Sequence, residues 1–304
     1  MRHGLQGWRR TGIKGKMKEG NKKLFPWVCS WIISAMLIIA AVLVVRGKSS
    51  GKTGHDIVIF GDSIVAYTQD DSSLANLLSR ATGMDVFDLS FGGTLMSYQA
   101  TDETPASFRN NLCMAAISKG IVADDYSLQI NAHISDSATD YFEDRAQGFK
   151  TVDFKKTDIV IIEQCINDYH CAVPIGDVNS TSEFTYCGAL KMTVENIRRA
   201  NPDIRIIILS PTMKWIDEET TAEDVDCGEG TFTDYVNAQR KMAEYLGVEY
   251  IDLTHIYDAP SEKYEENGEA ICGYTYTVDG THPNYYGRDR IAETIAEYLR
   301  DNER

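Results

Sequence analysis

The chain has 304 residues, of which 43% are apolar and 25% charged, and its formal net charge is −15. This size suits one α/β domain with a single hydrophobic core. Residues 1–52 contain eleven basic residues and one acid, whereas the remainder carries a net charge of −25. Such an acidic surface repels nucleic acid and anionic polymers, so we expect neither as a partner.

An uncharged run of 18 residues, residues 28–45, follows the basic segment. At about 1.5 Å per residue, a helix of this length just crosses a hydrocarbon core. Trp27 and Trp31 lie at one edge of the run, where interfacial aromatic residues are common, and eight of the eleven basic residues precede it. The pattern predicts a single-pass transmembrane helix with a cytoplasmic N-terminus.

A cleaved signal peptide is the alternative interpretation of this run. The apolar region of a signal peptide is usually shorter, and Arg46-Gly47-Lys48 carries no small-x-small cleavage signature. We therefore expect a basic cytoplasmic segment over residues 1–27, an uncleaved anchor over 28–45, a linker over 46–54 and a folded domain over 55–304. The domain is then extracellular, outside the cell membrane.

The first element of the domain is an apolar run over residues 57–60, typical of a strand buried on both faces of a parallel sheet. The run stops at Gly61, and Ser63 follows two residues later. Ligands bind outside the carboxyl ends of strands in open α/β sheets, so Ser63 is a candidate nucleophile. The alternative is that Ser63 caps the following helix.

Helical and strand patterns then alternate along the chain. The helical patterns cover residues 74–80, 106–118, 138–149, 188–200, 232–246 and 285–299, and the strand patterns cover 84–89, 158–163, 204–209 and 248–252. This alternation predicts a parallel sheet with helices on both faces. The segment 95–150 is longer than a crossover needs, so we expect part of it to form a lid or a substrate-side insertion.

A candidate base for Ser63 lies near the other end of the chain. Asp279 precedes His282 by three residues, so its carboxylate can fold back onto the imidazole, fix the tautomer and leave the other ring nitrogen for a serine. His133, His170 and His255 have no Asp at this spacing before a helix. Asp279 also fits an Asx turn, a role that is compatible with orienting His282.

Two further stretches lie between these blocks, Ser90-Phe91-Gly92-Gly93-Thr94 and Cys165-Ile166-Asn167-Asp168. The four blocks, in this order, resemble the SGNH (GDSL-type) hydrolase family over roughly residues 55–300. The resemblance implies a flavodoxin-like, three-layer α/β/α fold with a five-stranded parallel sheet in the order 2-1-3-4-5.

The resemblance also implies roles for individual residues. Ser63 is expected to attack an ester carbonyl, with His282 as general base and Asp279 as the group that stabilises the imidazolium. The oxyanion donors are expected to be the backbone N–H groups of Ser63 and Gly93 and the side-chain amide of Asn167. For Asn167-Asp168 alone, a simple turn after a strand is an equally good interpretation.

Two positions depart from the family pattern. The glycine that usually lies two residues before the asparagine is Cys165, and the usual Gly-x-Ser-Gly is Ser90-Phe91-Gly92-Gly93. Both changes replace one small side chain by another. We expect them to affect substrate preference more than activity.

The sequence thus predicts a membrane-anchored, extracytoplasmic serine esterase that forms an acyl-enzyme, with O-acyl or O-acetyl groups on carbohydrate as the first choice of substrate. The loops over residues 66–73 and 169–187 are too polar for a lipid tunnel. One alternative is a polysaccharide O-acetyltransferase that uses the same triad. Another is a catalytically silent glycan-binding domain, which would be expected to lack a triad member.

No cofactor and no metal are expected, because the seven cysteines and six histidines show no CxxC or Cys/His spacing typical of a metal site. Cys171 and Cys187 bracket a polar segment, so they either close a small disulfide loop or are free thiols.

Overall fold

The centre of the fold is a parallel sheet of five strands in the order β2-β1-β3-β4-β5. The strands are β1 (Ile57–Gly61), β2 (Val86–Asp88), β3 (Ile159–Glu163), β4 (Arg205–Leu209) and β5 (Glu249–Ile251). Every residue of β1 and β3 is buried, as expected for central strands that are covered on both faces. The observed strand order confirms the prediction.

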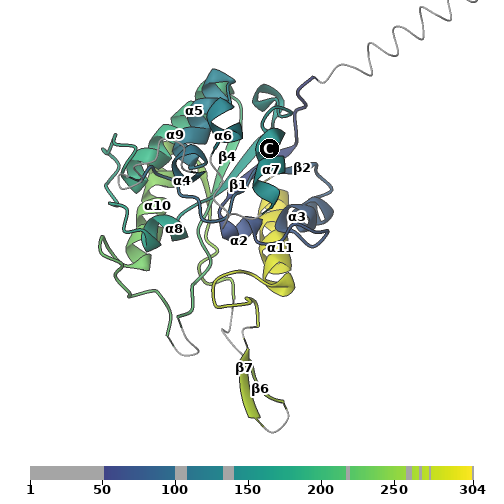
Figure 1. Ribbon diagram of the computed structural model, residues 1–304, viewed down its shortest axis with the longest axis vertical. Coiled ribbons are helices and arrows are strands. Elements are labelled where there is room, and N and C mark those ends of the chain that lie inside the picture. The colour runs from purple at the N-terminus through teal and green to yellow at the C-terminus, as the bar shows by residue number, and fades with distance from the viewer. Residues whose placement is uncertain are drawn as a thin grey trace, which may run out of the picture. The chain divides into compact units, whose positions relative to one another are not determined.

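Helices cover both faces of the sheet, which gives three layers (Figure 1). On one face lie α5 (Met114–Ala123), α9 (Tyr186–Ala200) and α10 (Phe232–Leu246), and on the other lie α3 (Leu74–Thr82) and α11 (Tyr285–Asp301). Helix α5 packs against α9, and α3 packs against α11. The remaining helices are short: α2 (Ser63–Ala66), α4 (Phe108–Asn111), α6 (Ser127–Ile130), α7 (Tyr141–Gly148), α8 (Ile166–His170) and a 3₁₀ turn over Phe154–Lys156.

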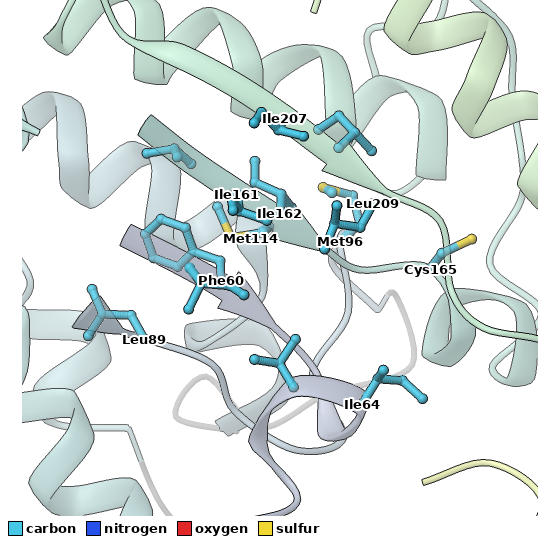
Figure 2. Packing of buried hydrophobic residues seen from close by; sticks show 14 of the residues in the cluster. Phe60, Ile64, Leu89, Met96, Met114, Ile161, Ile162, Cys165, Ile207 and Leu209 are labelled. Atoms are coloured by element: carbon cyan, nitrogen blue, oxygen red, sulfur yellow. The ribbon is translucent and has the colours of Figure 1, made fainter. Parts of the chain in front are cut away.

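The core is built from strand residues that meet the inner faces of these helices. Figure 2 shows Phe60 of β1, Ile161 of β3 and Ile207 of β4 in this cluster, together with Met114 of α5. These four side chains are fully buried. The sheet is thereby fixed on both sides, and the loops at its carboxyl edge extend from a rigid base.

Two predictions of elements need correction. The pattern over residues 106–118 predicts one helix, whereas the described part contains two, α4 and α5, with Cys113 as the N-cap residue of α5. The predicted polar loop over residues 169–187 begins inside α8. Helix α10, in contrast, has the predicted bounds because Thr231 and Asp234 form a capping box at its start.

The computed structural model describes residues 51–99, 108–132, 140–216, 220–257, 262–266, 269–273 and 275–302. The predicted anchor over residues 28–45 lies outside these ranges, and none of the described helices is long and apolar enough to span a membrane. Between β5 and the Asp279 block, the antiparallel pair β6 (Glu262–Glu266) and β7 (Glu269–Gly273) forms a hairpin for which the sequence pattern predicts no element.

Candidate active site

Ser63 lies at the carboxyl end of β1, where the strand turns directly into α2. A Cβ at Gly61 would lie 2.3 Å from Cγ2 of Val65, so only glycine fits this tight turn. Oδ1 of Asp62 accepts a hydrogen bond from the N–H of Ile64 at 2.9 Å and caps the helix. The cap is therefore Asp62 and not Ser63, whose hydroxyl remains available for another partner.

That partner is His282. The distance between Nε2 of His282 and Oγ of Ser63 is 2.9 Å, and the distance between Nδ1 of His282 and Oδ2 of Asp279 is 2.6 Å. Oδ1 of Asp279 accepts from the N–H groups of Thr281 and His282 at 3.0 and 2.8 Å. Desolvation raises the pKa of Asp279, but these hydrogen bonds outweigh it and leave the pKa below its usual value. The carboxylate is thus ionised and oriented.

The loop after β2 brings Gly92 and Gly93 beside Ser63. A Cβ at Gly92 would lie 3.6 Å from Cβ of Ser63, and Gly93 has a φ of +74°, which favours glycine. The N–H of Gly92 donates to the hydroxyl of Tyr141 at 2.9 Å. The N–H of Gly93 donates to no described residue, so it is available to a ligand.

Asn167 lies in α8, at the carboxyl end of β3, and lines the same cleft as Ser63. Its Nδ2 donates one hydrogen bond to the carbonyl of Thr94 at 2.9 Å. A primary amide has two N–H donors, so the second remains for a ligand. This contact also holds the amide beside the glycine loop.

The buried Asp168 ties α8 to the residues that follow the glycine loop. Its carboxylate accepts from the N–H groups of Met96 and Ser97 at 2.8 and 3.1 Å, and from the Ser97 hydroxyl at 2.5 Å. Burial raises the pKa of Asp168 to about 6, against the effect of these hydrogen bonds. The two blocks that would supply oxyanion donors are therefore connected through one buried carboxylate.

Helix α7 supports the glycine loop from its outer side, a role that the sequence pattern does not reveal. Besides the Tyr141 contact with Gly92, Nη1 of Arg145 donates to the carbonyl of Ser90 at 2.7 Å and lies 3.0 Å from Oδ2 of Asp88. Both partners of this ion pair are only 12% exposed. The predicted helix in the long segment 95–150 thus exists, and two of its side chains, Tyr141 and Arg145, contact the glycine loop.

A second pair of carboxyl groups is buried behind Ser63. Asp62 follows β1 and Glu163 ends the neighbouring β3, and the register places the last residues of the two strands side by side. Burial raises the pKa of Asp62 to about 7, and burial together with the charge of Asp62 raises that of Glu163 well above its usual value. Oδ2 of Asp62 and both Glu163 oxygens accept no hydrogen bond from a described residue, and the raised pKa values favour the protonated form of the pair.

The cleft in front of Ser63 has a volume of about 590 Å³. It is lined by the predicted residues Ser63, Asn167, Asp279 and His282, and also by His170, Lys214, Trp215 and Ile216. The sequence spacing does indicate that His170 lies near the site, because His170 follows Asn167 by three residues on one short helix and residues at this spacing are neighbours. Lys214 and Trp215 carry no such signal because the loop after β4 reaches the cleft only in the folded chain.

Several other expectations concern cysteines and metals. Cys171 and Cys187 are both free in the structure, so the disulfide alternative is wrong. Cys187 is buried within α9, whereas Sγ of Cys171 lies near the guanidinium of Arg109. Within the described ranges, no three His, Cys, Asp or Glu side chains form a metal-binding group.

Solved structures of other proteins show a similar fold. Among solved structures, a protein from Lactobacillus plantarum is 17% identical, with a TM-score of 0.54 over 82% of this chain and 99% of the other. A possible lipase from Chitinophaga pinensis is 16% identical, with a TM-score of 0.52 over 81% and 97%. At this identity both likenesses concern the fold alone.

A search of curated proteins found no match. The model of the GDSL-like lipase/acylhydrolase family matches residues 59–290, which include the Ser63, Gly93, Asn167 and His282 blocks. This match covers most of the described domain. The chain belongs to the GDSL-like lipase/acylhydrolase (SGNH) family, whose members act on ester bonds.

Proposed function

We propose that the protein is a serine esterase in which Ser63, His282 and Asp279 form the catalytic triad. The observation that carries this proposal is the continuous hydrogen-bonded chain from Oγ of Ser63 through His282 to Asp279. His282 takes the Ser63 proton as Oγ attacks the ester carbonyl, and then returns it to the leaving alkoxide. Water hydrolyses the acyl-enzyme by the same route in reverse.

The developing oxyanion would be bound by the N–H groups of Ser63 and Gly93 and by Nδ2 of Asn167. The free N–H of Gly93 and the second N–H of Asn167 support this assignment, because donors must be available before the charge forms. Asp279 keeps its negative charge throughout and stabilises the imidazolium.

Hydrolysis is favoured over acyl transfer by the exposure to water of the groups around His282. The Asp279 side chain is 50% exposed, and Tyr67, which stacks on the His282 ring, is 51% exposed. A transferase needs water excluded from the acyl-enzyme. A silent glycan-binding domain would have no reason to retain the complete triad geometry.

We further propose an O-acetylated carbohydrate as the substrate. The exposed ring of Tyr67 beside His282 offers a flat surface for the apolar face of a sugar, and Trp215 adds a second aromatic side chain to the lining of the cleft. The cleft combines a few polar groups with aromatic and aliphatic side chains, as small-molecule sites do.

The test of the triad is labelling with a serine-directed phosphonate. We expect the label on Ser63 and its loss in Ser63→Ala, while Ser182→Ala, a change at an exposed serine outside the cleft, is labelled normally. Label on another serine contradicts the assignment. Acetate release from acetylated sugars tests the substrate, and hydrolysis of 4-nitrophenyl acetate without any such release contradicts the carbohydrate proposal alone.

We also propose that residues 28–45 anchor the protein in the cell membrane with the domain outside. The uncharged run and the excess of basic residues before it support this placement. Protease added to intact cells should digest the domain. Full protection, with the protein recovered in the soluble cytosol, contradicts the proposal.

A further inference from the structure

The cleft contains one pair of ionisable side chains that the triad does not use, Lys214 and His170. Lys214 lies in the loop after β4, and His170 is the last residue of α8. Their side chains meet within the cleft lining, with 2.8 Å between Nζ of Lys214 and Nε2 of His170. Both therefore face the same space as Ser63.

The contact leaves the positive charge of Lys214 in the cleft unneutralised. A protonated lysine can only donate, so Nε2 of His170 is the acceptor and the ring is neutral. The pKa of His170 is lowered to about 4, chiefly by desolvation and further by the positive charge of Lys214. At neutral pH, His170 thus orients Lys214 without adding or removing charge.

No described carboxylate neutralises Lys214 through an ion pair. Asp279 is the one acid among the described cleft-lining residues, and its two oxygens already accept three hydrogen bonds from Thr281 and His282. The ammonium of Lys214 has three N–H donors, of which His170 accepts one. Two donors and a full charge therefore remain available to a ligand.

This local charge is opposite in sign to that of the domain as a whole. The net charge of −25 outside residues 1–52 disfavours long polyanions, but its effect on a small ion is screened beyond about 8 Å at physiological ionic strength. A cation in direct contact with its ligand is screened much less. The cleft is thus suited to a single negative group and not to an extended anionic polymer.

We propose that Lys214, oriented by His170, binds a carboxylate on the ester substrate. The carboxylate is carried either by an acidic sugar on the alcohol side or by a dicarboxylic acyl group. Lys214 acts as a binding residue through its ammonium, and His170 acts as a positioning residue. This proposal rests on the proposed function of the same cleft.

The experiment uses two matched substrate pairs with the full-length protein. On the alcohol side, the first substrate is the methyl glycoside of tri-O-acetyl glucuronic acid, with its carboxylate free. It is compared, by acetate release, with the corresponding tri-O-acetyl methyl glucoside, which lacks the carboxylate. On the acyl side, mono(4-nitrophenyl) adipate is compared with 4-nitrophenyl hexanoate. For each pair the measured quantity is the ratio of kcat/KM for the charged substrate to that for the neutral one.

In the unmodified protein we expect this ratio to be at least about ten for one of the two pairs, which identifies the source of the carboxylate, and to fall in high salt. Lys214→Met should lower the ratio at least tenfold, and Lys214→Arg should retain most of it. His170→Gln, which keeps an acceptor, should lower the ratio less than His170→Phe. Lys241→Met, on α10 and outside this cleft, changes the net charge equally and should leave the ratio unaltered.

Ratios near one for both pairs overturn the proposal, as does a ratio that Lys214→Met does not change. Either result leaves the esterase assignment intact if the neutral substrates are still hydrolysed in a Ser63-dependent manner. Failure of the proposed function appears differently, as the absence of Ser63-dependent hydrolysis for all four substrates.

Discussion

The two sides of the cleft are held in place by different kinds of contacts. On the base side, Asp279 and His282 are three residues apart, and the hydrogen bonds that orient the His282 ring come from within that short loop. On the donor side, Asp168 binds backbone groups 71 and 72 residues away in the sequence and is fully buried. The proposed base is thus positioned locally and near solvent, whereas the proposed oxyanion donors are positioned by the packed interior.

This difference predicts which substitutions should change catalysis alone and which should also displace the proposed oxyanion donors. A change in the Asp279 loop removes a function but leaves the packing of the sheet untouched. A change in the contacts around the glycine loop moves the donors, even when the residue itself never touches substrate.

The largest effect is expected on the base side, from Asp279→Asn. The Asn side chain cannot accept a hydrogen bond from Nδ1–H of His282 as the Asp279 carboxylate does. His282 therefore loses the tautomer that leaves Nε2 free to accept the Ser63 proton. We expect kcat for 4-nitrophenyl acetate to fall by roughly 10⁴. The midpoint of thermal unfolding should change little because the Asp279 side chain is half exposed. A loss below tenfold would show that His282 is oriented by other contacts.

A smaller effect is expected on the donor side, from Asn167→Ala. If its amide binds only the developing charge, kcat should fall by roughly 10²–10³ while KM stays nearly constant. The Thr94 contact is lost as well, so thermal unfolding must be measured in parallel. A variant that folds normally and keeps its full kcat would mean that this block is only a turn.

The smallest effect is expected from Tyr141→Phe, since the Tyr141 hydroxyl contacts Gly92 and would act on the proposed donors only through this loop. The change removes the acceptor for the Gly92 N–H and loosens the loop that carries Gly93. We expect a loss of about tenfold in kcat with little change in KM, because a small displacement weakens donors that act in the transition state. Tyr245→Phe, at an exposed position of α10, is the matched control. Equal activity of both variants would show that the loop is rigid without Tyr141.

The same difference explains how much of the site the sequence predicts. Asp279 and His282 can be paired from spacing alone, and Ser63 from its place after an apolar strand. The roles of Tyr141, Arg145 and Lys214 depend on which distant segments the sheet brings together, and no periodicity carries that information. The strand order of the fold is predicted through the family resemblance, whereas the β6–β7 hairpin has no counterpart in the hydrophobic pattern.

The buried carboxyl pair of Asp62 and Glu163 has a consequence for the pH dependence of folding. Both pKa values are raised in the folded state, so between about pH 4 and pH 7 the folded chain holds more protons than the unfolded chain. The stability that this proton provides is complete below the unfolded pKa values and is lost as the pH rises through about 7, by at most about 1.4 kcal/mol per pH unit for each proton.

General-base catalysis changes in the opposite direction with pH, because an imidazole accepts a proton only when it is neutral. The protonated Asp62–Glu163 pair thus stabilises the fold at low pH, whereas general-base catalysis by an imidazole is favoured by a rise in pH. Glu163→Gln should flatten the dependence of the unfolding midpoint on pH between 5 and 8, and an unaltered slope would contradict the raised pKa values of this pair. Stability and general-base catalysis thus depend on pH in opposite directions, through two different segments of the chain, the turn after β1 and the Asp279–His282 loop.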